Sequence, residues 1–162
     1  MQSYFANRTC DPYSDRSIPC TLGNYVSYSV KATKAEDVVS AIKFAKTEKI
    51  RLLVRNTGHD FLGRSTGAGA LAIWTQSLKN ITFGDWSDKY YTGPSVTVGA
   101  GVMGNELLEA AHKEGMTVVS GECATVGLAG GFTQGGGHSV LSTAFGLGAD
   151  QTLSFQVRRS ML

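Results

Sequence analysis

The chain has 162 residues, of which 42% are hydrophobic and 17% are charged. This length and composition are sufficient for a domain with a buried core, and they exclude intrinsic disorder. The formal net charge is +2 and the Lys and Arg residues are scattered, so neither a nucleic-acid-binding surface nor a polybasic membrane anchor is expected. No apolar run approaches the length that spans a bilayer.

The first half of the chain is predicted to form a small β-α-β unit. Residues 25–30 alternate and are rich in β-forming residues, which is typical of a strand. The pattern Thr33-Lys34-Ala35-Glu36 is a capping box, and helical apolar spacing continues to about Lys49. A Gly-rich loop at 56–70 then separates two short apolar strands, at 52–54 and 71–74.

The second half is predicted to be a mixed α/β subdomain that begins after a turn at residues 84–89. Alternating apolar residues predict strands, and helical spacing predicts short helices. In chain order these are a strand at 95–98, a helix at 105–113, a strand at 116–119, a short helix at 139–145 and a strand at 151–157. The tail 158–162 follows the last strand directly, so we expect the final sheet to be incomplete.

Cys10 and Cys20 flank a short polar segment ahead of the first predicted strand. We expect a disulfide between them, which would constrain the unfolded chain by about 3 kcal/mol and requires an oxidising compartment. Two N-glycosylation sequons, at Asn7 and Asn80, also favour a secreted protein. The residues after Met1 are polar and show no signal peptide, but we still expect an extracellular location.

A GxGxxG pattern from Gly99 to Gly104 follows a predicted strand and precedes a predicted helix. It is formally a dinucleotide-binding fingerprint, in which glycines let a pyrophosphate approach a helix N-terminus. An NAD-dependent dehydrogenase that uses this pattern is therefore one alternative function. A Rossmann unit beginning at residue 95 has room for barely two strands, however, and it leaves two richer glycine segments unexplained.

The first of these segments is Arg55-Asn56-Thr57-Gly58-His59-Asp60, where a strand enters a Gly-rich loop. Backbone N–H groups in such a turn form a concavity that suits a diphosphate. The second segment runs from Gly121 to His138 and holds Cys123 among glycines, whereas a core cysteine usually lies among larger apolar residues. A surface histidine and a structural cysteine are the alternative interpretations. No metal site is expected, because Cys123 has no partner at ligand spacing.

Two long motifs, RNTGHDFLGRSTGAGALAIWT and GECATVGLAGGFTQGGGHSVLSTAFGLGADQ, closely resemble those of the berberine-bridge-enzyme-like flavoproteins. This family lies in the vanillyl-alcohol-oxidase superfamily and has a PCMH-type FAD domain. The resemblance implies bound FAD, with His59 bonded to the flavin 8α-methyl group and Cys123 bonded to flavin C6. It also implies cofactor contacts from residues around these two, namely Arg55, Asn56, Thr57, Gly58, Asp60, Leu62, Gly63, Gly121, Val126, Gly127, Gly130 and Gly131.

The resemblance implies an α+β fold with a PCMH-type FAD-binding domain at 25–157, incomplete at its C-terminus. The segment 1–24 would carry the disulfide, and the tail 158–162 is atypical. The family's substrate domain, which usually supplies the catalytic base, is not present, so no catalytic residue is assigned. The implied activity is oxidation of an alcohol, saccharide or alkaloid-like molecule by hydride transfer to the flavin, with dioxygen as acceptor. A further alternative is a truncated, catalytically inactive flavin-binding remnant.

Overall fold

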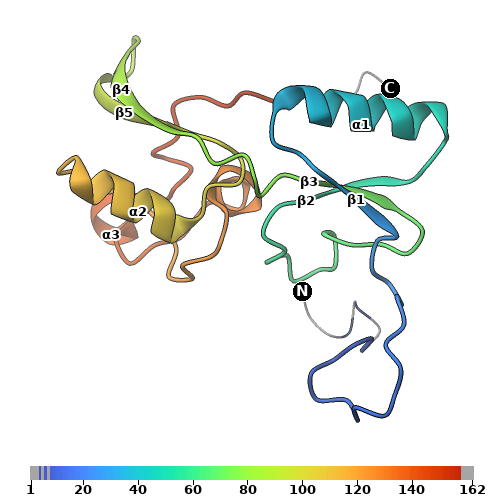
Figure 1. Ribbon diagram of the computed structural model, residues 1–162. Coiled ribbons are helices and arrows are strands. Elements are labelled where there is room, and N and C mark those ends of the chain that lie inside the picture. Colours follow the sequence, from blue (N-terminus) through green and yellow to red (C-terminus); the bar gives the residue numbers. More distant parts are fainter. Residues whose placement is uncertain (1–3, 5, 7, 158–162) are drawn as a thin grey trace. The chain divides into compact units, whose positions relative to one another are not determined.

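The structure, a computed structural model, describes residues 4, 6 and 8–157 (Figure 1). It divides into two compact units, the first extending to Ser77 and the second comprising Leu78–Gln156, and each is described by itself. The boundary lies before the turn predicted at 84–89. Asn7 of the first sequon and the predicted atypical tail 158–162 lie outside the described residues.

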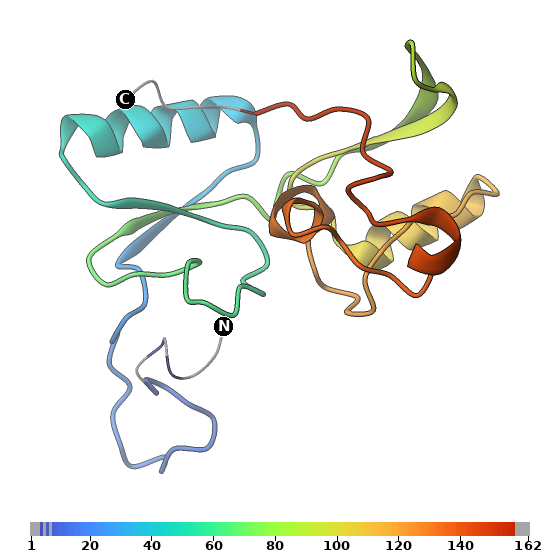
Figure 2. The same ribbon diagram turned by 180° about the vertical axis from the view of Figure 1, so that it is seen from behind.

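The first unit contains a three-stranded parallel sheet with the strand order β1-β3-β2. The strands are β1 (Tyr28–Lys31), β2 (Leu52–Arg55) and β3 (Leu71–Trp74), and α1 (Ala35–Thr47) packs along one face of the sheet, as Figures 1 and 2 show. The core consists of Ala32, Ala41 and Ile73 with partly buried Val30, Val38, Ile42 and Leu52 packed around them. The predicted β-α-β unit is confirmed, and β3 lies between its two strands.

The N-terminus of α1 is stabilised by Asp37, not by the Glu36 of the predicted capping box. Asp37 Oδ2 accepts hydrogen bonds from the N–H and Oγ1 of Thr33, both at 2.9 Å, and from the N–H of Lys34 at 3.2 Å. These hydrogen bonds hold the pKa of the Asp37 carboxyl below its usual value. The helix therefore begins one residue later than the sequence pattern predicted.

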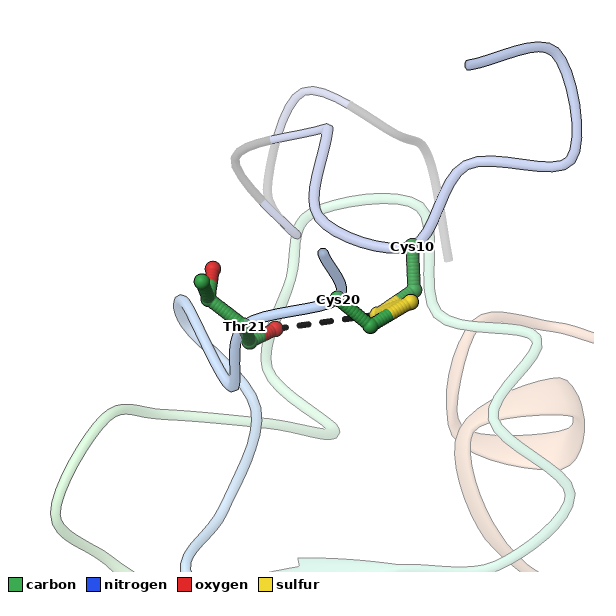
Figure 3. Close-up of a disulfide and its surroundings, with 3 residues drawn as sticks. All are labelled: Cys10, Cys20 and Thr21. Carbon is green, nitrogen blue, oxygen red and sulfur yellow. Dashed lines mark hydrogen bonds between the residues drawn. A yellow bond between two sulfur atoms is a disulfide. The ribbon is translucent and has the colours of Figure 1, made fainter. Parts of the chain in front are cut away.

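The N-terminal segment carries the predicted disulfide between Cys10 and Cys20, whose Cα atoms are 5.0 Å apart (Figure 3). The carbonyl oxygen of Thr21 lies 3.7 Å from Cys10 Sγ, which is a contact only, because a disulfide sulfur carries no proton. The segment joins the rest of the unit through Thr66 Oγ1. This hydroxyl donates to Asn24 O at 3.1 Å and accepts from the Val26 N–H at 3.2 Å.

The second unit begins with an antiparallel hairpin of β4 (Ile81–Ser87) and β5 (Thr92–Val98). The turn predicted at 84–89 is wrong, because most of that range belongs to β4. The actual turn is built by Asp88, whose carboxylate accepts hydrogen bonds from Tyr90 N–H, Tyr91 N–H and Trp86 Nε1. The helix predicted at 105–113 is confirmed as α2 (Gly104–Lys113).

The remainder of the second unit contains only short helical turns, a π-helical turn η1 (Leu128–Phe132) and α3 (Ser142–Phe145). The strands predicted at 116–119 and 151–157 are wrong, since neither range is paired with another strand among the described residues. Val118 still packs against the core of Val102, Leu107 and Leu128. In the second range, however, the apolar residues Leu153, Phe155 and Val157 are exposed. Alternation of apolar residues alone therefore does not establish a strand, which also requires a hydrogen-bonded neighbour.

Candidate functional site

The first glycine-rich loop leaves the carboxyl edge of the parallel sheet, where α/β sheets commonly bind ligands. It begins after Arg55, the last residue of β2, and returns as β3. The Arg55 carbonyl accepts a hydrogen bond from Thr75 N–H at 2.9 Å, and the Asn56 carbonyl accepts one from Trp74 Nε1 at 3.0 Å. The start of the loop is thereby fastened to the end of the central strand.

A guanidinium group covers the turn that precedes His59. Gly58 has φ +81°, and a Cβ at this position would come within 2.9 Å of Arg55 Nη2. The positive φ favours glycine at this position, and the Arg55 side chain lies over the space that a Cβ would enter. Thr57 is half-buried and His59 is exposed. A cation beside a turn of this kind suits a phosphate-bearing ligand.

The next residues of the loop are shaped by Asp60. Its Oδ2 accepts a hydrogen bond from Arg64 N–H at 2.5 Å, and its Oδ1 lies 3.6 Å from Arg64 Nε. This carboxylate therefore organises the loop. Phe61 and Leu62 next to it are 69% and 61% exposed. Leu62 is among the predicted cofactor residues and Phe61, two residues after His59, is not. An exposed aromatic side chain can stack on a flat ligand.

The second glycine-rich segment presents a free cysteine on a hydrogen-bonded turn. Cys123 is exposed and carries no disulfide. Its carbonyl accepts a hydrogen bond from Val126 N–H at 3.2 Å, and Gly127 forms an isolated antiparallel bridge with Met103. The Cys123 thiol therefore lies at the surface, on a turn whose backbone is held by these hydrogen bonds.

Two glycines downstream of this turn face open space. At Gly130 and Gly131 an added Cβ would meet no chain atom within 4 Å, and Gly130 interrupts the helical conformation of η1. Nothing in the packing of the second unit therefore requires glycine there. A bare backbone of this kind allows a flat ligand to approach closely. These residues and the arginine-covered loop fit FAD.

Two other glycines of this segment, Gly121 and Gly137, pack against the ring of Phe132, a contact that the sequence did not predict. A Cβ added at Gly121 would lie 3.0 Å from the Phe132 ring, and at Gly137 it would lie 2.7 Å away. The predicted cofactor residue Gly121 is therefore also explained by contact with an aromatic ring. Cofactor contacts at the remaining predicted positions stay predictions.

The GxGxxG pattern has a structural explanation that does not involve a dinucleotide. A Cβ at Gly99 would collide with the backbone of Leu78, so this glycine permits a close backbone approach within the chain. The N–H groups at the start of α2 donate to acceptors of the chain itself: Met103 to Glu106 Oε2, Gly104 to Val126 O and Asn105 to Ala124 O. Since these amides are already bonded, the pattern offers no pyrophosphate site.

The predicted site residues fall into two sets that lie in different units. One set lies in the loop at 55–63, and the other lies at 121–131.

Within the described part of the chain, no three His, Cys, Asp or Glu side chains are grouped so that they could hold a metal ion. None of the described helices is long and apolar enough to cross a membrane.

The fold is that of the VAO-type flavoproteins. A crystal structure of the VAO-type flavoprotein MtVAO615 from Myceliophthora thermophila C1 matches with a TM-score of 0.87 and 49% identity, covering 90% of this chain and 27% of that chain. The family model described as "FAD binding domain" matches residues 11–159. The chain therefore belongs to the FAD-binding domain family, while its assignment to the berberine-bridge-enzyme-like branch stays a prediction.

Curated relatives carry oxidoreductase names. The FAD-linked oxidoreductase ZEB1 of Gibberella zeae is 60% identical over 157 residues, which is 97% of this chain and 28% of that protein. The VAO-type flavoprotein oxidase VAO615 of Thermothelomyces thermophilus is 49% identical over 158 residues, which is 97% of this chain and 28% of that protein. The chain thus spans little more than a quarter of the length of these relatives.

Proposed function

We propose that this chain binds FAD covalently through His59 and Cys123, as part of an enzyme that oxidises an alcohol, saccharide or alkaloid-like small molecule. When bound, FAD would supply a hydride acceptor for the substrate, and dioxygen would serve as the oxidant that restores it. The observation that carries the proposal is the position of His59. It follows an arginine-covered turn in a loop fastened to the carboxyl edge of a parallel sheet.

The side chains of the first loop suit the separate parts of the cofactor. The Arg55 guanidinium would neutralise the diphosphate, and exposed Phe61 and Leu62 would cover apolar ring surface. In the second unit, the open backbone at Gly130 and Gly131 would lie against a flat ring system. The names of the relatives ZEB1 and VAO615 support an oxidoreductase, and the name of VAO615 supports an oxidase.

Each attachment is a net two-electron oxidation that needs an oxidant. At His59 a C–N bond replaces the imidazole N–H and one C–H of the flavin 8α-methyl group. At Cys123 a C–S bond replaces the thiol S–H and the C–H at flavin C6. Both side chains are of the nucleophilic types that form covalent links in enzymes. In each case two protons and two electrons pass to dioxygen, so one hydrogen peroxide forms per bond.

The test is to incubate the purified chain with FAD in air, denature it in acid and digest it. Mass spectrometry then shows whether flavin is attached to the peptides that contain His59 and Cys123. His59→Ala and Cys123→Ser should each remove one attachment and leave the other. The double variant should release all flavin on denaturation.

His112→Ala is the matched control, because His112 is an exposed histidine on α2 outside both glycine-rich segments. It should keep both attachments. Flavin that stays bound to the acid-denatured double variant would contradict the proposed residues. A chain that binds NAD and takes up no flavin would contradict the cofactor.

An extracellular location is part of the proposal and is supported by the disulfide, because cytosolic conditions keep thiols reduced. Asn80 and Thr82 of the second sequon are exposed, whereas Ile81 between them packs against the core. A glycan on Asn80 is therefore sterically possible. Protein from a secretory host should lose mass on enzymatic deglycosylation of the Asn80 peptide, and Thr82→Ala but not Thr82→Ser should abolish this loss.

A further inference from the structure

The turn that carries Cys123 is held by the first turn of α2. Gly104 N–H donates to Val126 O and Asn105 N–H donates to Ala124 O, both at 3.0 Å. Val126 N–H in turn donates to Cys123 O at 3.2 Å. The carbonyl groups on the C-terminal side of the cysteine are therefore fixed by amides that would otherwise have no partner at a helix N-terminus.

The start of α2 is itself anchored by an ion pair. Glu106 accepts two hydrogen bonds from Lys79 Nζ, at 2.9 and 2.7 Å, and a third from Met103 N–H at 2.8 Å. Burial raises the pKa of Glu106, but the hydrogen bonds from Lys79 and Met103 and the charge of Lys79 outweigh burial, so the pKa lies below its usual value. A charged Glu106 thus fixes the helix end that holds the turn.

We propose that Gly104 and Asn105 are positioning residues, which hold the Cys123 turn so that its thiol is presented to flavin C6 in one orientation. This inference rests on the attachment of Cys123 proposed above. Bond formation is sensitive to placement, since a displacement of about 1 Å can cost on the order of 100-fold in rate. The turn needs such support because Cys123 itself is exposed and its side chain is not packed into the core.

Gly104 allows one of the two hydrogen bonds to be removed without losing the helix. Proline is favoured at the first position of a helix, and it lacks the N–H that would donate to Val126 O. The preceding residue Met103 has φ −94° and ψ 161°, the extended conformation that a residue before proline prefers. A Cβ at residue 104 would lie 2.7 Å from Ser120 Oγ and at least 3.7 Å from other atoms, so Ser120→Ala relieves the collision.

The experiment compares Gly104→Pro/Ser120→Ala with Gly104→Ala/Ser120→Ala. Both variants add a Cβ at residue 104, but proline also replaces the N–H with a ring Cδ, so Val126 O loses its donor and is pushed away from the helix end. Circular dichroism should show the same helix content in both. In the chain without flavin, hydrogen exchange of the peptide covering 124–128 should be faster in the proline variant. After incubation with FAD in air, flavin on the Cys123 peptide should fall at least tenfold in the proline variant, and flavin on the His59 peptide should be equal in both.

Equal flavin attachment at Cys123 in the two variants would overturn the positioning role, even if the attachment itself is real. If the parent chain takes up flavin at neither residue, the proposed function fails and the exchange measurement decides the inference separately. If the peptide 124–128 then exchanges hydrogen equally fast in the two variants, the role of α2 in holding the Cys123 turn is overturned. Faster exchange in the proline variant would support that role.

Discussion

Among single residues, Phe132 shows how glycine sets the packing of the second unit. Its ring lies against Gly121, Gly137 and Gly148, so it occupies space that side chains at those positions would fill. We predict that Gly137→Ala lowers the free energy of unfolding by about 1–3 kcal/mol, because it forces a Cβ to 2.7 Å from the ring and Gly137 has φ +74°. Urea denaturation measures this loss.

The matched control for that substitution is Gly131→Ala, in which the added Cβ would meet no chain atom within 4 Å. Its free energy of unfolding should change by less than about 0.5 kcal/mol, as for most substitutions away from packed sites. Equal losses in the two variants would show that the contact with Phe132 is not the cause.

Glu106 makes the stability of the second unit depend on pH. The carboxyl has a lower pKa in the folded chain than in the unfolded chain, so its contribution is present above the unfolded pKa and is lost as the pH falls through the folded value. We predict that the urea midpoint of the chain exceeds that of Glu106→Gln at neutral pH. The difference should shrink as the pH is lowered below the usual glutamate pKa. A difference that is constant with pH would contradict this assignment.

The individual residues that could be predicted from the sequence all lie in short, contiguous motifs. The disulfide between Cys10 and Cys20 was predicted from a short contiguous segment and is present. The assignment of His59 and Cys123 to the cofactor also came from contiguous motifs and stays a prediction. The Lys79–Glu106 pair could not be predicted, because 27 residues separate its members and neither lies in a recognisable motif. The glycines around Phe132 were likewise read as cofactor loops or turns, since a sequence does not show which side chain a glycine faces.

At the scale of elements, β3 is the structural centre of the first unit. It pairs with β1 on one side and β2 on the other, and its Ile73 is 1% exposed. We predict that Ile73→Ala lowers the free energy of unfolding by about 2–5 kcal/mol. Hydrogen exchange should become faster in β1 and β2 as well as in β3.

Val54→Ala on β2 is the control, because Val54 is 60% exposed and its truncation removes little buried apolar surface. A loss of less than about 1 kcal/mol is expected. If Val54→Ala were as damaging as Ile73→Ala, the position of β3 at the centre of the core would be in doubt.

Elements with strong helical or apolar periodicity, namely α1, α2, β2 and β3, were predicted to within a few residues. The hairpin was largely missed because β4 contains Gly84 and Asp85, which are turn-forming residues by composition. In the structure they pair with Ser95 and Pro94, and the partner strand overrides the local preference. The order of the strands in the sheet could not be predicted from the sequence either, because pairing between remote segments leaves no local pattern.

At the scale of the whole molecule, the disulfide closes a segment that has few contacts with the rest of the first unit. Residues 12–20 are exposed and bonded mainly to their near neighbours. We predict that Cys10→Ser/Cys20→Ser lowers the free energy of unfolding by clearly less than the roughly 3 kcal/mol expected for an ordered loop of this length. The reason is that the freed segment can open locally while the sheet remains folded.

Trypsin cleavage after exposed Arg16 measures this opening. In the oxidised chain the two products should stay joined by the disulfide, whereas in the double serine variant the N-terminal peptide should be released faster than the sheet is digested. Simultaneous digestion of both parts would show that the disulfide supports the entire first unit.

The strand order β1-β3-β2 has a consequence for biosynthesis. The ribosome makes the two outer strands first, and neither has its hydrogen-bonding neighbour until Trp74 has been synthesised. Until then the nascent chain can form α1 but no sheet. The loop that carries His59 must also close before β3 can insert, at an entropic cost that rises by only about 0.6 kcal/mol for each doubling of loop length. Natural variants could therefore lengthen this loop with little penalty to folding, but a chain interrupted before residue 71 would leave both outer strands unpaired and prone to association.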